Sequence, residues 1–590
     1  MLTLGPREIL WDRQDDGTLR MRSADPLRPY PDRLTDRLFE TAAAHPDRVL
    51  IARRENGTGD WQRVTYGQSA PRICAIARAL HARGLSAERP VVILSGSSVE
   101  HGLLALGALV AGVPYASVTP AYSLLDKTHR KLVHVLDLLT PGLVFVQDRA
   151  PFAAALAHVA EETEIVTAAD LDSLTADGDD PAPPAPDAIA KFIFTSGSTG
   201  LPKAVIVTHR MWAANQQMFL QAFPFLADQP PVFTDWLPWH HVSGNNQVIG
   251  MTLMLGGSLY IDDGKPLRDA MPLTVSNLKD VPPTACFSVP KGFAELVPYL
   301  KSDAAFARGF LSSIAFFFYS GASLPPDLQA EMQQLSEQVT GRRIPVFSAY
   351  GATETAPFSL VANWLDAPTG LAGLPMAGVE LKLAPLAGKY EARLRGPIVT
   401  PGYWRDAEKT AAAFDGEGFL KLGDSLGLVD PANPAAGLAF EGRIAEDFKL
   451  TTGTWVNVGR LRDRFLTLAG LCARDIVLTG ENRDEIGGLV FLSEQDAGDL
   501  AGASGLPALA RHPAIRAHLQ GVLDSMAKES TGSSTRLAWI KVLSDEPDPL
   551  AGEVTDKGSV SQRGVLAARA DLIAGLYADP AGEGALVAAG

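Results

Sequence analysis

The chain has 590 residues, of which 46% are hydrophobic and 20% charged, with a formal net charge of −15 at pH 7. This length is enough for more than one hydrophobic core, so two or three lobes are expected. Lysine and arginine are spread along the chain and form no runs, which argues against a nucleic-acid-binding surface. Any anionic ligand must therefore be bound by local groups.

The cysteine content and the apolar segments indicate the cellular compartment in which the protein is expected. Three cysteines lie far apart in the sequence: Cys74, Cys286 and Cys472. An odd count without metal-ligand spacing argues against a disulfide framework or a zinc site. The N-terminus, MLTLGPREILWDRQDDG, lacks the features of a secretory signal, and the most apolar stretch, residues 102–118, is broken by Gly112 and Pro114. We expect a cytoplasmic protein without a membrane span.

Helical and β-rich segments alternate along the chain. Residues 72–85, RICAIARALHARGL, have a helical apolar period that ends at Gly84, and the β-rich run PVVILSG follows. Residues 102–118 read as a buried helix running into a strand. The alternation recurs in LVHVLDLLTPGLVFVQ and from AELVPYL to SSIAFFFYSGA. This pattern predicts an α/β fold with layered sheets.

Two changes in composition indicate the organisation of the chain. Residues 175–186, TADGDDPAPPAP, read as an exposed loop. After Phe440 the sequence changes to a charged segment, a strand-like IVLTG, an Ala-rich helical part and LAWIKVL. We therefore expect a large multi-lobed N-terminal domain over residues 1–442 and a small α/β domain over residues 443–590.

The segment FIFTSGSTGLPK, residues 192–203, is the most informative one. An apolar strand runs into six residues made only of Thr, Ser and Gly, which Pro202 and Lys203 follow. Such a loop offers backbone N–H groups, hydroxyls and a cation to a polyphosphate, because glycine lets the backbone approach closely. The Walker A pattern does not fit, since Gly197 and Gly200 are too close together and Ala204 follows the lysine. The loop predicts a different kind of phosphate site.

Further motifs follow in a fixed order: AYGATET at 349–355, EARLRGPIVTPGYW at 391–404, FLKLGD at 419–424, GRIAEDFKLTTG at 442–453 and EVTDKGSVSQR at 553–563. With the TSGSTGLPK loop, they resemble the superfamily of acyl-CoA synthetases, adenylation domains and luciferases. The resemblance spans the 190s to the 560s. It implies a large adenylation domain and a small mobile domain that closes over the active site.

The resemblance implies a nucleotide site. The phosphate loop would hold the β- and γ-phosphates of ATP through Thr195, Ser196, Gly197, Ser198, Thr199, Gly200 and Lys203. Tyr350 would lie against the adenine, Thr353 would contact the α-phosphate, and Glu354 would help to hold Mg²⁺, which prefers oxygen ligands. Asp424 would accept both ribose hydroxyls, and Arg443 would support the ribose or phosphate side. Taken singly, such charged residues read as solvated surface groups; their order along the chain favours a site.

The resemblance also implies two half-reactions. The carboxylate would attack the α-phosphate of ATP, and a thiol, most simply that of coenzyme A, would then attack the acyl adenylate. Lys557 would bridge the reacting carboxylate and phosphate oxygens, and Thr353 and Glu354 would be the other catalytic residues. The residues around Lys557 depart from the common GKxxR pattern. Lys449 and Gly453 would line the path of the pantetheine arm after the small domain rotates.

The hinge of that rotation departs from the family pattern. Ala445, followed by Glu446, stands where the superfamily often has an acidic pair. Rotation about Ala445 is expected without the usual first carboxylate.

Three segments, GRIAEDFKLTTGTWVNVGRLR, DWLPWHHVSGNN and EVTDKGSVSQR, resemble the bacterial feruloyl-CoA synthases more specifically. This implies a planar aromatic propenoate such as ferulate, p-coumarate or caffeate. The candidates for the acyl pocket are Trp239, His241, Gly321 and Gly351. We assign His241 binding rather than acid–base chemistry, and His240 replaces an asparagine expected in this subgroup.

Several alternatives stay open. The acid could be an aryl, arylalkanoyl or medium-chain fatty acid, and the acceptor could be a carrier protein. The segment LGDSLG, residues 422–427, looks like a phosphopantetheine attachment site on Ser425, but it overlaps Asp424 and lacks a surrounding four-helix segment. The assembly state, with a homodimer as one option, is also open.

Overall fold

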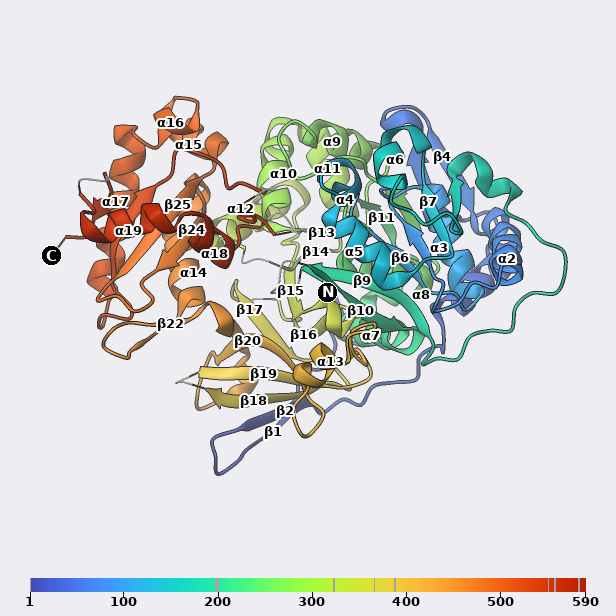
Figure 1. Cartoon of the computed structure of the whole chain (residues 1–590), viewed down its shortest axis with the longest axis horizontal. Helices are drawn as coiled ribbons and strands as arrows, with labels where there is room; N and C mark the ends of the chain where they lie inside the picture. The colour runs from blue at the N-terminus through green and yellow to red at the C-terminus, as the bar shows by residue number, and fades with distance from the viewer. Residues whose placement is uncertain are drawn as a thin grey trace. The chain divides into compact units, whose positions relative to one another are not determined.

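The computed structural model describes residues 2–196, 201–321, 324–365, 367–386, 389–549, 551–555, 559–581 and 584–589. It confirms the predicted α/β class, with stacked sheets in a large unit and a smaller α/β unit (Figure 1). The larger unit comprises Met1–Lys382, Arg393–Leu422 and Leu428–Leu438; the smaller comprises Leu383–Ala392, Gly423–Gly427 and Ala439–Gly590. The smaller unit thus includes two short segments from earlier in the chain.

A six-stranded sheet of the larger unit carries the phosphate-loop motif. Its order is β10-β9-β6-β5-β7-β8, and only β10 runs antiparallel to its neighbour. The strands are β5 (Val91–Ile93), β6 (Tyr115–Ser117), β7 (Leu143–Val146), β8 (Glu164–Thr167), β9 (Ile189–Ser196) and β10 (Pro202–Thr208). Strands β5, β6 and β7 are fully buried, as their continuous apolar runs predict for a parallel sheet.

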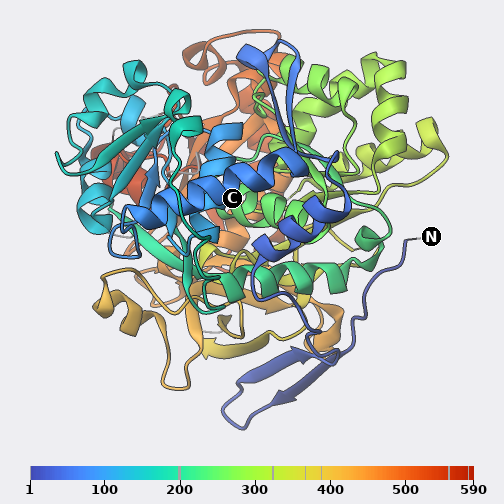
Figure 2. The same ribbon diagram turned by 90° about the vertical axis from the view of Figure 1, so that its right-hand side faces the viewer.

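Helices connect and cover these strands. They are α2 (Tyr66–Ala82), α3 (Val99–Val110), α4 (Ala121–Leu124), α5 (Arg130–Leu139) and α6 (Arg149–Leu156). The predicted helix ending near Gly84 is confirmed: Thr65 and Gln68 form a capping box at the start of α2, and Gly84 adopts a φ of 62° after its end. In Figure 2 the blue helices α1 (Leu34–Ala44) and α2 lie side by side.

Two further sheets complete the core of the larger unit. One has the order β11-β12-β3-β4 and the other contains the run β17-β16-β15-β14-β13. Their strands are β3 (Val49–Arg54), β4 (Trp61–Thr65), β11 (Val232–Asp235), β12 (Ser258–Ile261), β13 (Ala285–Ser288), β14 (Phe316–Tyr319), β15 (Val346–Gly351), β16 (Phe358–Ala362) and β17 (Leu371–Pro375). Their helices are α7 (His209–Ala222), α8 (Ile249–Met254), α9 (Met271–Asp280), α10 (Pro290–Ser302), α11 (Ala304–Ser313) and α12 (Pro326–Thr340).

Helix α7 is central to this unit. Twelve of its residues are buried, on every face of the helix, and it contacts β10, β16, α1 and α8. A helix buried all round normally carries only apolar side chains, but α7 contains HRMWAANQQMFLQA. Its polar side chains therefore require partners inside the protein.

The remaining elements lie at the chain start and where segments of the two units alternate. Strands β1 (Ile9–Arg13) and β2 (Leu19–Ser23) form an antiparallel hairpin. The others are β18 (Glu380–Leu386), β19 (Lys389–Arg395), α13 (Ala407–Ala413), β20 (Leu420–Leu428) and β21 (Leu438–Arg443).

The smaller unit has its own core, formed by a sheet of order β24-β25-β26-β27 and the helices packed on it. Its elements are β22 (Phe448–Lys449), β23 (Trp455–Val456), α14 (Val458–Ala469), β24 (Ala473–Thr479), β25 (Ile486–Leu492), α15 (Glu494–Ala501), α16 (Leu506–Leu509), α17 (Pro513–Glu529), β26 (Leu537–Val542), α18 (Gln562–Ala568), α19 (Ala570–Ala578) and β27 (Leu586–Val587). None of the helices within the described ranges of the chain is long and apolar enough to cross a membrane.

A buried carboxyl lies at the end of β11, six residues before His241. Asp235 is 8% exposed, and its Oδ1 accepts a hydrogen bond of 2.8 Å from the Leu237 N–H. Burial raises the pKa of Asp235 to about 8, because the charged form loses its hydration. The neighbouring Asp262, also buried, accepts from Thr274 Oγ1 at 2.6 Å.

This raised pKa predicts a pH-dependent stability. The folded state binds a proton that the unfolded state has released, so stability contributed by Asp235 is lost as pH rises towards the folded-state pKa of about 8. Asp235→Asn mimics the protonated form. Its melting temperature relative to wild type should therefore increase between about pH 5 and about pH 8. The exposed Asp269→Asn serves as the control; a difference for Asp235→Asn that is constant over this range would contradict the assignment.

Candidate active site

The phosphate-loop motif lies between β9 and β10. The two strands pair so that Thr195 lies opposite Lys203 and Ser196 opposite Pro202. Gly197, Ser198, Thr199 and Gly200, predicted to contact phosphate, lie outside the described residues, as does the Ser196 side chain. The Oγ1 of Thr195 is buried and has no hydrogen-bond partner within the described part of the chain. An orphaned hydroxyl here suits a ligand oxygen or an ordered water.

Three segments distant in sequence meet at Lys203 on β10. The Lys203 Nζ donates a hydrogen bond of 2.9 Å to the Tyr403 hydroxyl, which donates one of 3.0 Å to the Glu354 Oε1. The Lys203 ammonium also lies 3.7 Å from the same carboxylate oxygen and 4.1 Å from the centre of the Tyr403 ring. A cation, a hydroxyl and a nearly buried carboxylate thus form one connected group.

Backbone hydrogen bonds hold the segment around Tyr403 in place. The Ile206 N–H donates to the Gly402 carbonyl at 3.1 Å, and the Thr400 N–H donates to the Glu354 carbonyl at 2.9 Å. Gly402 has a φ of 145°, and an added Cβ would lie 2.4 Å from the side chain of Thr410. The GYW motif is therefore a structural bridge between the phosphate-loop strand and the Glu354 turn.

The AYGATET motif places the predicted nucleotide contacts at the end of β15. Tyr350 is its second-last residue and is 9% exposed, and Thr353 and Glu354 begin the short turn that follows. At Gly351 a Cβ would lie 1.9 Å from the carbonyl oxygen of Pro357, so the backbone approach requires glycine. The motif thus fixes the direction of the Glu354 turn.

The predicted ribose contacts lie in the smaller unit. Asp424 lies on β20 with its side chain 6% exposed, and its Oδ1 is 3.0 Å from the Arg443 Nε on β21. The two residues that the sequence assigned to the ribose side are therefore an ion pair. Ser425 is fully buried in the same strand, which does not fit an attachment site for a phosphopantetheine arm.

The predicted pantetheine-path residues form a hairpin in the same unit. Lys449 ends β22 and its ammonium lies 4.9 Å from the centre of the Trp455 ring. Gly453 forms the turn with a φ of 78°. Ala445 lies in the short helical turn Ile444–Glu446. The predicted catalytic Lys557 lies outside the described residues.

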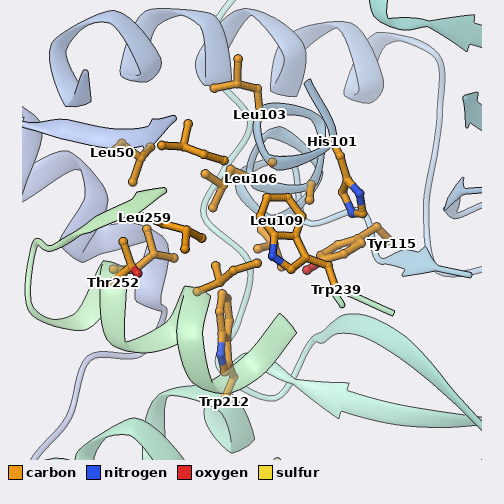
Figure 3. Close-up of a pocket in the computed structure, with 15 residues that line it drawn as sticks. Leu50, His101, Leu103, Leu106, Leu109, Tyr115, Trp212, Trp239, Thr252 and Leu259 are labelled. Atoms are coloured by element: carbon orange, nitrogen blue, oxygen red, sulfur yellow. The ribbon is translucent and has the colours of Figure 1, made fainter. Parts of the chain in front are cut away.

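The predicted acyl-pocket residues have different surroundings. Trp239 is 4% exposed and packs edge-on against His101 at 4.9 Å between ring centroids. Figure 3 shows both rings at an apolar cavity of about 30 Å³, which has room for about one water and not for an aromatic acid. Gly321 is exposed with a φ of 82°.

The two adjacent histidines lie between this cavity wall and the helix that follows. The rings of His240 and His241 are 4.4 Å apart. Burial is the main reason that the pKa of His240 falls to about 3. His240 is therefore neutral near pH 7 and can offer one donor and one acceptor.

A buried lysine on the phosphate-loop strand had no predicted role. Lys191 is fully buried, lies 3.5 Å from the centre of the Trp212 ring and donates 2.8 Å to Asn245 Oδ1. Asn245 also accepts from the Tyr115 hydroxyl at 2.8 Å and donates to the Trp239 carbonyl at 2.6 Å. Burial lowers the pKa of Lys191 well below its ordinary value. The network links the phosphate-loop strand to the Trp239 turn; its only sequence signal is a lysine in an apolar run.

Comparison with known proteins identifies the family of the chain. The sequence profile of the AMP-binding enzyme family matches residues 38–404, more than half of the chain. The medium-chain fatty-acid–CoA ligase of Escherichia coli is 25% identical over 430 residues, covering 66% of this chain and 69% of that protein. Feruloyl-CoA synthase of an Amycolatopsis species is 26% identical over 402 residues, covering 63% and 75%.

Solved structures share the fold. The anthranilate CoA ligase AuaEII in complex with anthranoyl-AMP has a TM-score of 0.72 at 18% identity, covering 94% of this chain and 99% of that one. ATP-bound MatB of Rhodopseudomonas palustris has a TM-score of 0.69 at 21% identity, covering 91% and 98%. The chain therefore belongs to the family of AMP-binding enzymes, in which adenylate-forming acid–thiol ligases are found.

Proposed function

We propose that this enzyme activates a hydroxycinnamate such as ferulate with ATP and transfers the acyl group to coenzyme A. The Lys203–Tyr403–Glu354 group beside the phosphate-loop hairpin carries the adenylation half of this proposal. It offers a cation for phosphate oxygens and a carboxylate for a hard cation.

In the first half-reaction a carboxylate oxygen of the acid attacks the α-phosphorus of ATP, the bond to the bridging oxygen breaks, and pyrophosphate leaves. Lys203 and the loop would bind the β- and γ-phosphates and thereby stabilise the leaving group. Tyr350 and Thr353 would orient the adenine and the α-phosphate, and Asp424 the ribose. In the second half-reaction a thiolate attacks the acyl carbonyl and AMP leaves.

Glu354 is the residue that fits Mg²⁺. Its carboxylate is nearly buried, accepts a hydrogen bond from the Tyr403 hydroxyl and lies 3.7 Å from the Lys203 ammonium. In the ranges that the structure describes, no group of three or more His, Cys, Asp or Glu side chains could hold a metal. This agrees with Mg²⁺, which uses one or two carboxylates together with substrate phosphates and waters. When bound, the ion would neutralise phosphate charge.

The choice of acid rests on motifs. The feruloyl-CoA synthase and the medium-chain ligase are 26% and 25% identical, so identity does not separate the two substrate classes. The segments DWLPWHHVSGNN and GRIAEDFKLTTGTWVNVGRLR favour the hydroxycinnamate, with His241 and Gly351 lining the acyl site. We also propose that a C-terminal domain, residues 443–590, closes over the active site. Lys449 and Gly453 would then line the path of the thiol.

Product analysis tests the proposal. Purified protein is incubated with ATP, Mg²⁺, coenzyme A and one of ferulate, p-coumarate, benzoate, phenylacetate or octanoate, and product masses are followed. We expect feruloyl- or coumaroyl-CoA with AMP. Turnover of octanoate or benzoate alone would overturn the acid, and an adenylate that reacts only with a carrier protein would overturn the acceptor.

Tyr403→Phe tests the connected group. The variant removes the hydroxyl between Lys203 and Glu354 but keeps the ring below the ammonium. Because hydrogen bonds to charged groups are lost, the KM for Mg-ATP should rise about tenfold while the KM for the acid stays unchanged. Tyr260→Phe on β12 is the control. Equal effects on both KM values would point to a general structural role.

Lys557→Ala tests the late lysine. If its ammonium bridges the reacting oxygens, the variant loses adenylate formation far more than thioester formation from a preformed adenylate. Both rates are measured separately, the second with synthetic acyl adenylate and coenzyme A. Equal losses in both steps would refute the assignment.

A further inference from the structure

Four amide side chains lie buried between α7 and the helical turn that follows His241. They are Asn215 and Gln216 on α7 and Asn246 and Gln247 in the π-helix Ser243–Val248. All four are at most 1% exposed. π-Helices are rare and occur frequently at functional sites, because the extra residue per turn redirects side chains.

Six polar atoms of these side chains have no hydrogen-bond partner among the residues that the structure describes. They are the Oδ1 of Asn215, the Oε1 of Gln216, and both amide atoms of Asn246 and Gln247. Buried polar groups in proteins are almost always paired, because leaving one unpaired costs the free energy of its lost hydration. These atoms on two adjoining elements are donors and acceptors that a polar ligand group or an ordered water would satisfy.

The amides are tied to both sides of the candidate active site. The Gln216 Nε2 donates 3.2 Å and the Trp212 Nε1 donates 2.8 Å to the backbone carbonyl of Asn246, which joins α7 to the π-helix (Figure 3 shows Trp212). The π-helix is anchored to the preceding turn by the Asn245 N–H, which donates 2.9 Å to the His241 carbonyl.

The other side is the turn that carries Glu354. The Asn215 Nδ2 donates 2.6 Å to the Phe358 carbonyl and lies 3.5 Å from the carbonyl oxygen of Thr355, the residue after Glu354. The buried amides therefore connect the His241 segment with the Glu354 turn, which are the two segments expected to bind the acid and the nucleotide.

The chemistry of the four side chains defines the occupant. Each amide is uncharged and offers both donors and an acceptor, which matches a neutral group that can itself donate and accept. A hydroxyl or a hydroxyl beside an ether oxygen meets this description, whereas an alkyl chain end does not. An unsubstituted fatty acid would leave these amide atoms unpaired.

We propose that Asn246 and Gln247, with Gln216, bind a hydroxyl substituent at the end of the acid that is remote from its carboxyl group. This inference rests on the proposed function, in that it specifies the acid of the same reaction: one with a neutral hydrogen-bonding far end. Neither the family assignment nor any relative's name supplies these residues. Selectivity follows because an acid without the hydroxyl leaves buried amides unpaired.

Binding measurements test this separately from turnover. Calorimetry gives the Kd of three matched pairs in the presence of α,β-methylene-ATP: p-coumarate with cinnamate, 4-hydroxybenzoate with benzoate, and 8-hydroxyoctanoate with octanoate. The hydroxylated member of at least one pair should bind at least about tenfold more tightly. Equal Kd values within every pair mean that the amides hold water only, and overturn the proposal.

The variants Gln247→Leu and Asn246→Leu identify the residues. Each should abolish the preference by weakening the hydroxylated acid, with the other acid unchanged. The melting temperature should stay the same or rise, because leucine removes orphaned polar atoms. Gln217→Leu is the matched control: it lies on α7, is 8% exposed, and its amide has a partner, Gln221, at 3.4 Å. A preference that survives in both leucine variants would refute the assignment.

The outcome is distinguishable from failure of the proposed function. If the product assay yields no hydroxycinnamoyl-CoA while 8-hydroxyoctanoate binds more tightly than octanoate, the acid of the proposed function is wrong and the amide site stands. If feruloyl-CoA forms but no pair shows a binding preference, the activity stands and the amide site is wrong.

Discussion

The hydrogen bonds from Lys203 through Tyr403 to Glu354 are the interaction on which the proposed adenylation site of the larger unit depends. Each residue comes from a different segment, and each segment is fixed by backbone pairing: the β9–β10 hairpin, the end of β15 and the loop around Gly402. The lysine and the glutamate also form a direct ion pair, with 3.7 Å between the ammonium nitrogen and the carboxylate oxygen. The tyrosine hydroxyl binds both charged groups, which holds the ammonium and the carboxylate in place at the β9–β10 hairpin.

A second constraint is the loss of hydration by polar groups that are buried elsewhere in the larger unit. Lys191, Asp235 and the amides of α7 and the π-helix are all buried, and each such group opposes folding unless it gains a partner. Lys191 gains Asn245 and the ring of Trp212. The orphaned amide atoms of α7 and the π-helix lack such partners in the described part of the chain. A site of this kind destabilises the folded protein when it is empty, and it selects a ligand that pairs its polar atoms.

The sequence predicted the local elements well where one physical signal dominates. The apolar run 102–118 became α3 and β6, residues 175–186 form no helix or strand, and the Ser/Gly-rich motif joins two strands. The structure also brings Glu354 to Lys203 and Arg443 to Asp424, two ion pairs that the motifs alone did not predict. The roles of these residues, of Lys557 and of the acyl-pocket candidates stay predictions.

Other features could not be read from sequence because they depend on tertiary contacts. Tyr403 is part of the EARLRGPIVTPGYW motif, yet nothing in the neighbouring sequence shows that its hydroxyl contacts both Lys203 and Glu354. The smaller unit takes in residues 383–392 and 423–427, since strands far apart in the chain pair in space. The amides of α7 also look like ordinary polar helix positions until their burial is known.

The central claim is that the acid reacts with ATP before any thiol is involved. Exchange of labelled pyrophosphate into ATP, measured without coenzyme A, tests it most directly because only reversible adenylate formation produces that exchange. The account predicts exchange that requires both Mg²⁺ and the acid and that a hydroxycinnamate supports. Acid-independent exchange, or thioester formation with release of ADP and phosphate, would contradict it.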